Sequence, residues 1–181
     1  MSDAMKSSGL KIGIVLVGHG SPATDCPPEF VGEMMGLEWR KNSQPGGTSE
    51  SQVQQRIAQL DQKIRTWPRT DRNDPYKVGL EKLADKLKPL LNGKLFAIAY
   101  NEFCSPTLEQ TVGELVRQGA ERILVIPTML TPGGLHSEKD IPRSIEEVRR
   151  LHPAVSMEYL WPFDLAAVAG LLADQIGRVC P

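Results

Sequence analysis

Two histidines and one glutamate, His19, Glu102 and His136, each follow a short apolar run of the chain. Runs of this length, rich in β-branched residues, are typical of buried strands in a parallel sheet. The carboxyl ends of parallel strands meet at one edge of the sheet, where open α/β sheets bind their ligands. Two imidazoles and a carboxylate at that edge could hold a divalent transition metal and leave coordination positions open. Since imidazole binds Co, Ni, Fe and Zn alike, the ligand types do not select the metal.

The segments around the two histidines are rich in glycine and proline. His19 lies within Gly18-His19-Gly20-Ser21, and His136 follows Pro132-Gly133-Gly134. Glycine lets the backbone approach a ligand closely and adopt conformations that other residues avoid. Each histidine alone is compatible with an ordinary surface or capping role, whereas the three residues together favour a metal site. The remaining histidine, His152, precedes Pro153 at an expected helix end, where it would interact with the helix dipole.

The apolar runs alternate with amphipathic helical patterns. We expect strands at residues 11–17, 95–100, 122–127 and 155–160, and the helices that follow the later strands are expected to begin near Ser105-Pro106, Asp140 and Asp164. Another helix is expected after the cap Asp74. This alternation predicts an α/β fold with a doubly wound, four-stranded parallel sheet. We expect a single domain over residues 1–181, with 22–73 as a helical insertion after the first strand.

The composition of the chain argues against several classes of binding partner and against a membrane protein. The formal net charge is -1 over 181 residues, so neither nucleic acid nor an anionic membrane is an expected partner. The three cysteines, Cys26, Cys104 and Cys180, are too widely spaced for a disulfide framework or a structural zinc site. Residues 1–9 are polar, which argues against a signal peptide. No apolar run approaches the roughly 20 residues that a membrane span needs. A cytoplasmic protein is the resulting expectation.

The same motifs resemble a known family. Gly18-His19-Gly20-Ser21 after an apolar strand resembles the opening of the sirohydrochlorin chelatases, the class II, CbiX-like cobaltochelatases and ferrochelatases. The stretch Gly133-Gly134-x-His136-x-x-x-Asp140-Ile141-Pro142 resembles their second signature, and Glu102 resembles an acidic residue that they carry ahead of a Pro-initiated helix. The resemblance covers residues 12–21 and about 95–176. It implies one chelatase-like, flavodoxin-like half of the larger family members.

What the resemblance implies is insertion of Co²⁺, Ni²⁺ or Fe²⁺ into sirohydrochlorin or a related macrocycle. In that interpretation His19 and His136 hold the incoming ion, and Glu102 accepts pyrrole N–H protons or adds a ligand. Two protons must leave the ring as the metal enters, so the reaction requires a base. The metal is then a substrate, and no cofactor is retained. The second wall of the cleft would come from a homodimer partner, as in the small family members, or from the inserted helices.

Further contacts with the tetrapyrrole are expected at the glycine-rich loops and at one helix start. The loop residues are Gly20, Ser21, Gly133 and Gly134. Lys139 and Arg143 lie four residues apart and could bind the carboxylates of the macrocycle. An ordinary solvated helix face is the simpler interpretation of that pair.

Two other functions stay open at this point. The first is a non-enzymatic carrier that binds metal or tetrapyrrole without inserting the ion. The second is a histidine-metal dioxygenase, because His19-Gly20-Ser21-Pro22 also resembles extradiol dioxygenases of the DOPA-dioxygenase type, which need further histidines. A histidine phosphatase would require an arginine where Gly18 stands. The metal, the macrocycle and the oligomeric state are left undetermined by the residues.

Overall fold

The sheet carries the residues of interest on its central strands. The structure, a computed structural model, describes residues 9–43 and 50–180. The interpretation of residues 1–9 as no signal peptide falls almost wholly outside the described residues. The strands are β1 (Ile12–Gly18), β2 (Leu95–Tyr100), β3 (Arg122–Pro127) and β4 (Ser156–Tyr159). All pairings are parallel and the order is β2-β1-β3-β4, which confirms the predicted four-stranded parallel sheet.

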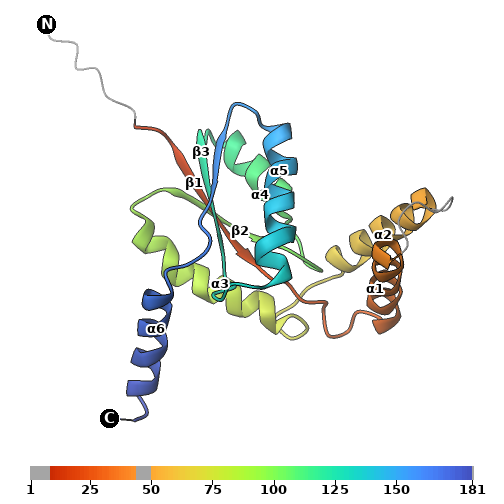
Figure 1. Ribbon diagram of the computed structural model, residues 1–181, viewed down its shortest axis with the longest axis horizontal. Helices are drawn as coiled ribbons and strands as arrows, with labels where there is room; N and C mark the ends of the chain where they lie inside the picture. The colour runs from red at the N-terminus through yellow and green to blue at the C-terminus, as the bar shows by residue number, and fades with distance from the viewer. Residues whose placement is uncertain (1–8, 44–49, 181) are drawn as a thin grey trace, which may run out of the picture.

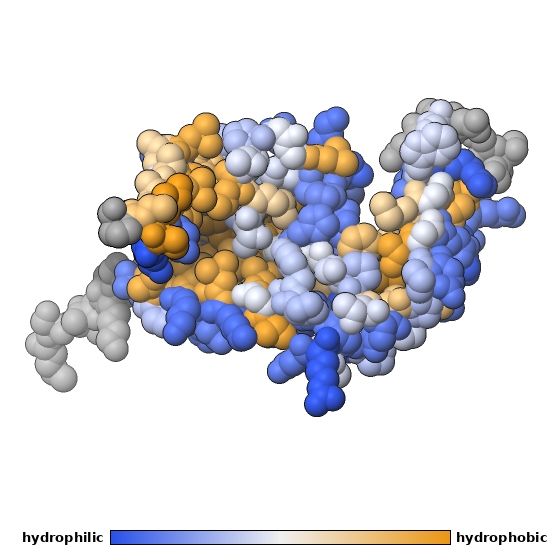
Figure 2. Space-filling model, turned by 90° about the horizontal axis from the view of Figure 1, so that it is seen from below, coloured by the Kyte–Doolittle hydropathy of each residue, from blue (hydrophilic) through white to orange (hydrophobic). Residues whose placement is uncertain are grey.

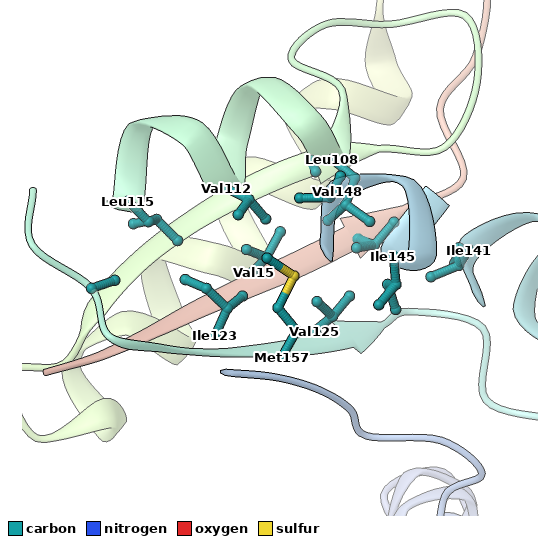
Figure 3. Packing of buried hydrophobic residues seen from close by; sticks show 13 residues of the cluster. Val15, Leu108, Val112, Leu115, Ile123, Val125, Ile141, Ile145, Val148 and Met157 are labelled. Atoms are coloured by element: carbon teal, nitrogen blue, oxygen red, sulfur yellow. The ribbon is translucent and has the colours of Figure 1, made fainter. Parts of the chain in front are cut away.

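Helices cover both faces of this sheet, as a doubly wound fold requires. On one face, α4 (Leu108–Arg117) and α5 (Ile141–Leu151) pack against alternate residues of β1 and β3, and Figure 3 shows this core from close by. On the other face, α3 (Pro75–Leu87), followed by the short η1 (Lys88–Leu91), packs its Leu80 and Ala84 against Leu16 of β1. Because successive strand residues point to opposite faces, the continuous apolar run of β1 serves both layers.

The helix starts follow from local capping. Asp74 accepts a hydrogen bond from the Lys77 amide at 2.9 Å, so α3 begins where the sequence predicts. The helix α4 begins later than the expected Ser105-Pro106, because Thr107 and Gln110 form a reciprocal capping box.

Segment 22–73 contains two helices, α1 (Pro28–Ser43) and α2 (Glu50–Arg65). They pack against each other and project to one side of the sheet (Figure 1). Their contact has a small core of its own, which includes Met34, Leu60 and Ile64. The helical nature of the segment is therefore as expected. Its status as an insertion, and the single-domain boundary 1–181, stay predictions.

The last helix, α6 (Leu165–Gly177), departs from the doubly wound pattern. Asp164 accepts a hydrogen bond from the Ala166 amide at 2.8 Å and caps it as predicted. None of its residues is buried, however, and in Figure 1 it points away from the sheet. Its apolar side chains are therefore left uncovered by the described part of the chain. No helix among the described residues has the length and apolarity that a membrane crossing requires.

Candidate metal centre

His19, Glu102 and His136 converge at the carboxyl edge of the sheet. One potential ligand atom of each lies within 4.8 Å of those of the other two. The three residues follow β1, β2 and β3, which are neighbours in the sheet, so parallel pairing brings together positions far apart in sequence. All three side chains are partly buried. The convergence expected from the strand ends is thus present in the fold.

Backbone hydrogen bonds hold the segment of Glu102 against that of His19. The Glu102 amide donates to the His19 carbonyl at 2.8 Å, and the Asn101 amide donates to the Gly18 carbonyl at 2.9 Å. Gly20 has φ +91°, and a Cβ there would lie 1.9 Å from the Glu102 carbonyl oxygen. Only glycine fits this contact. Gly20 therefore allows the backbone to approach the loop that carries Glu102, whereas the sequence suggested an approach to a ligand.

The His19 ring is oriented through its Nδ1 atom. This atom lies 2.7 Å from the Gly20 carbonyl oxygen, which can only accept, so Nδ1 carries the proton. The lone pair is then on Nε2, the atom left free to bind a metal ion. The His19 amide donates to the Tyr76 hydroxyl at 2.6 Å. Tyr76 lies one residue after the start of α3, and nothing in its helical spacing indicates this contact.

His136 is oriented by a carboxylate. It opens a single π-helical turn, His136–Asp140, in which its Nδ1 lies 2.8 Å from Asp140 Oδ2. If Nδ1 carries the proton that this contact requires, the lone pair is on Nε2, which is then free to bind a metal ion. Carboxylate–imidazole pairs of this kind orient metal-binding histidines. Two further groups approach the same atom, the Asn101 side-chain nitrogen at 3.1 Å and Glu102 Oε1 at 3.5 Å. The i, i+4 spacing to Asp140 was the available sequence signal, whereas Asn101 had none.

Contacts outside the cluster support the π turn. The Ser137 carbonyl accepts a hydrogen bond from the Tyr159 hydroxyl at 2.8 Å, and the Gly133 amide donates to Glu138 Oε1 at 2.5 Å. Burial raises the pKa of Tyr159 to about 12, so its hydroxyl remains protonated and able to donate at neutral pH. π turns recur at functional sites because they redirect one side chain of a helix. Here the π turn begins at His136, whose side chain lies in the cluster with His19 and Glu102.

A cleft of about 460 Å³ opens beside Glu102 and His136. One wall contains residues of the sheet edge, its loops and α5. The opposite wall is α1–α2, which contributes Met34, Met35, Glu38, Lys41, Ile57, Asp61 and Arg65. In Figure 2 the α1–α2 lobe is separated from the main body by a notch, with apolar side chains gathered on the side that faces the body. Helices α1 and α2 of segment 22–73, one of the two alternatives expected for the second wall, thus line this cleft.

Arg65 at the end of α2 joins the helix pair α1–α2 (the hairpin) to the loop that carries Glu102. Its guanidinium donates to the carbonyl oxygens of Asn101 at 2.9 Å and Cys104 at 2.8 Å. It also pairs with Asp61 at 2.7 Å. Backbone carbonyls on both sides of Glu102 are therefore bound by one planar guanidinium group.

Arg69 joins the same loop to the loop after β1. It donates to the Ser21 carbonyl at 2.7 Å and to the Phe103 carbonyl. It also pairs at 2.5 Å with Asp74, and the two side chains are only 10% and 2% exposed. The residues that follow His19 and Glu102 are thus tied to one buried cation. Arg65 and Arg69 therefore join α2 and the segment that follows it to the loops after β1 and β2. The apolar periodicity of the sequence does not indicate these contacts.

The remaining candidates lie around this centre. Arg143 lines the cleft and its guanidinium lies 3.4 Å from Asp140, whereas Lys139 is exposed and is not among the lining residues. Gly20, Ser21, Gly133 and Gly134 do not line the cleft either, and their contacts with a substrate stay predictions. Cys104 is buried, and its burial raises the pKa of the thiol, so no reactive thiolate is present beside Glu102. His152 is the C-cap residue of α5.

The family model CbiX matches residues 71–178, which is more than half of the chain. The chain belongs to the CbiX family. The matched region of this CbiX member includes Glu102 and His136. His19 and the helices α1 and α2 lie outside it.

Curated relatives of this CbiX member are named as chelatases. It is 39% identical over 79 residues to a sirohydrochlorin cobaltochelatase from Methanocaldococcus jannaschii, a match that covers 43% of the chain and 54% of the relative. It is 30% identical over 95 residues to a sirohydrochlorin ferrochelatase from Priestia megaterium, covering 52% of the chain and 35% of the relative. The chain thus spans about half or less of the length of these relatives.

Among solved structures, a CbiX protein from Marinobacter aquaeolei VT8 is similar over 92% of this chain and 98% of its own, with 20% identity and a TM-score of 0.48. The sirohydrochlorin chelatase SirB from Bacillus subtilis, in complex with cobalt, is similar over 84% of this chain and 44% of its own, with 20% identity and a TM-score of 0.48. Likeness at this level carries no information about activity.

Proposed function

We propose that the protein is a chelatase that inserts a divalent metal, Co²⁺, Fe²⁺ or Ni²⁺, into sirohydrochlorin or a related tetrapyrrole. The observation that carries the proposal is the cluster of His19, Glu102 and His136, of which Glu102 and His136 line a cleft. Both Nδ1 atoms are engaged by acceptors, so both Nε2 atoms are available to one ion. Membership of the CbiX family and the names of its relatives support the same reaction.

The ligand set suits an ion that is a substrate. Two neutral imidazoles and one carboxylate fill only some positions of a six-coordinate ion, so macrocycle nitrogens can enter the remaining positions. Partial exposure of the three side chains lets the ion arrive from solvent and leave within the product. Glu102, beside the ion, accepts a proton from a pyrrole N–H as the nitrogen becomes a ligand.

The cleft provides both apolar and cationic contacts for the macrocycle. Met35 of α1 and Leu135 of the loop before His136 line it, with exposed fractions of 56% and 59%. These side chains contact the apolar ring. Lys41 and Arg143 also line the cleft and pair with the peripheral carboxylates of the substrate. Apolar contact and charge pairing together orient the ring over the metal ligands.

The test is the spectral change of anaerobic sirohydrochlorin mixed with Co²⁺ or Fe²⁺ in the presence of the protein. We expect an accelerated shift that is lost when His19 and His136 are both replaced by alanine. His152→Ala is the matched control, since this histidine caps α5 and is not part of the cluster. A shifted spectrum without acceleration would indicate a carrier and overturn the enzymatic proposal. Acceleration that survives in the double variant would overturn the assignment of the site.

We also propose that the protein is a homodimer in which α6 packs on the second copy. Its apolar residues Leu165, Leu171, Leu172 and Ile176 are each 55–63% exposed, and a helix with so few charged residues is normally buried. On the sheet face that α3 covers, Leu124 of β3 remains only partly buried. One chain therefore carries both an uncovered helix and an incompletely covered sheet face, which two copies satisfy reciprocally.

Sedimentation equilibrium tests the dimer. We expect a dimer for the wild-type protein and a monomer for Leu171→Asp combined with Leu172→Asp. Leu151→Asp is the control, because this leucine is equally exposed but lies at the end of α5. A wild-type monomer at micromolar concentration would contradict the proposal. The cytoplasm is the proposed location of the protein.

A further inference from the structure

A fourth acidic side chain faces the candidate metal centre from the other wall of the cleft. Glu38 of α1 lines the cleft together with Glu102, His136 and Asp140. Its side chain is exposed to the cleft. Within the described part of the chain, none of the ion pairs involves Glu38, whereas Asp61 and Asp140, which line the same cleft, are both paired. Glu38 is therefore a carboxylate with free lone pairs on the α1 side.

The position of Glu38 is held by the packing of the hairpin. Buried Met34, one turn before Glu38 on α1, packs in the core shared with α2. On the neighbouring turn, Glu33 pairs with Arg56 of α2 at 2.7 Å. The end of α2 is in turn fastened by Arg65 to the loop of Glu102. A continuous set of contacts thus joins the helix that carries Glu38 to the loop that carries Glu102.

The electrostatic surroundings of Glu38 favour binding of a proton. Partial removal from water and, after it, the negative charges of Glu102, Asp61 and Asp140 raise the pKa of the Glu38 carboxyl, and the charge of Lys41 opposes them. Glu102 and Asp140 line the same cleft as Glu38. This agrees with the geometry, in which the two walls of one cleft face each other.

The proposed reaction requires acceptors for two protons, and these acceptors can lie on opposite faces of the macrocycle. Two pyrrole N–H protons leave for each ion that enters. An ion held by His19, His136 and Glu102 approaches one ring face, and its positive charge repels protons on that face. Loss of a proton toward the opposite face is therefore favoured. With the ring in the cleft, the opposite face is directed at α1.

We propose that Glu38 is a second catalytic base, which accepts a macrocycle N–H proton on the ring face opposite the metal. The inference rests on the proposed function and deepens it. One N–H bond breaks with its proton passing to Glu38, and the other with its proton passing to Glu102. Each electron pair remains on nitrogen and forms a bond to the metal ion. Both carboxyls then release their protons to water, and no oxidant or reductant is involved.

The variant Glu38→Gln tests this role, because glutamine keeps the size of the side chain but accepts no proton. We expect kcat for insertion of Co²⁺ to fall by about 100-fold, the lower range for loss of a positioned base. The KM values for Co²⁺ and for sirohydrochlorin, and the affinity for Co²⁺ alone, should not change. Glu38→Asp should restore part of the rate. Glu29→Gln is the matched control, because Glu29 is an exposed carboxylate on the same helix and lies outside the cleft lining.

The outcomes separate this inference from the function on which it rests. An active wild-type protein with an equally active Glu38→Gln variant would overturn the inference and leave the chelatase proposal intact. A raised KM with unchanged kcat would make Glu38 a binding contact and also overturn the role as a base. A wild-type protein that does not accelerate insertion would remove both proposals.

Discussion

The imidazole rings of His19 and His136 meet edge to face, with centroids 4.6 Å apart and planes at 88°. In each ring the Nδ1 atom is bound to an acceptor, which is a backbone carbonyl for His19 and a carboxylate for His136. The two residues therefore differ in what orients them. The His136 ring depends on a side chain that can be replaced without changing the backbone.

The first prediction concerns that side chain, Asp140. Asp140→Ala removes the acceptor 2.8 Å from His136 Nδ1, so the ring is no longer held in one tautomer. We expect the affinity for Co²⁺ to fall by about 10- to 100-fold, as for other partners of metal-binding histidines. Titration of the apoprotein with Co²⁺, followed by visible absorption, measures it. Asp85→Ala, an exposed carboxylate on α3, is the control, and equal affinities in the two variants would contradict the role of Asp140.

The second prediction compares Gly20 with Gly133. Both have φ +91°, but a Cβ at Gly20 would lie 1.9 Å from the Glu102 carbonyl oxygen, whereas nothing lies within 4 Å of one at Gly133. Gly133→Ala should cost only the left-handed strain of about 1–2 kcal/mol. Gly20→Ala should cost more and should also weaken Co²⁺ binding, because the loop of Glu102 must move. Urea unfolding and Co²⁺ titration measure the two effects, and equal losses of stability would show that the close contact can relax.

The third prediction concerns the buried pair of Arg69 and Asp74. Arg69→Met leaves the Asp74 carboxylate 2% exposed without its cation. We expect the free energy of unfolding to fall by about 3–5 kcal/mol, as when one partner of a buried pair is removed. Arg56→Met breaks the pair with Glu33, whose side chains are 43% and 42% exposed, and should change stability far less. Urea denaturation decides between these cases, and similar midpoints for both variants would contradict the prediction.

The fourth prediction concerns thiol reactivity. Cys26 and Cys104 are buried and Cys180 is exposed. Burial raises the pKa of Cys26 and of Cys104, so at pH 8 both hold less of the reactive thiolate than an exposed cysteine, and their reactivity should rise only at more alkaline pH. One thiol per chain should react rapidly with a disulfide reagent in the native protein, and three in denaturant. Cys180→Ser should abolish the fast phase. A second fast thiol would mean that one buried site opens readily.

Much of the fold follows from local pattern. The apolar runs that become β1, β2 and β3 are recognisable because helices cover both faces of a parallel sheet, which favours apolar residues at successive positions of its strands. The caps Asp74 and Asp164 are recognisable because their side chains bond amides two or three residues away. The convergence of His19, Glu102 and His136 also follows, since parallel strands end at a common edge.

Other features depend on contacts between segments far apart in sequence. The fit of Gly20 against Glu102, the bond from His19 to Tyr76 and the clamp of Arg69 on two loops have no local signal, because each distance depends on which elements are neighbours. The position of α1–α2 opposite the metal ligands is of the same kind. The apolar pattern of α6 predicted a helix with a side to bury, and only the tertiary structure shows that the chain itself does not cover it. Periodicity determines which face of an element is apolar, whereas the surface that meets this face is decided by the packing of the whole chain.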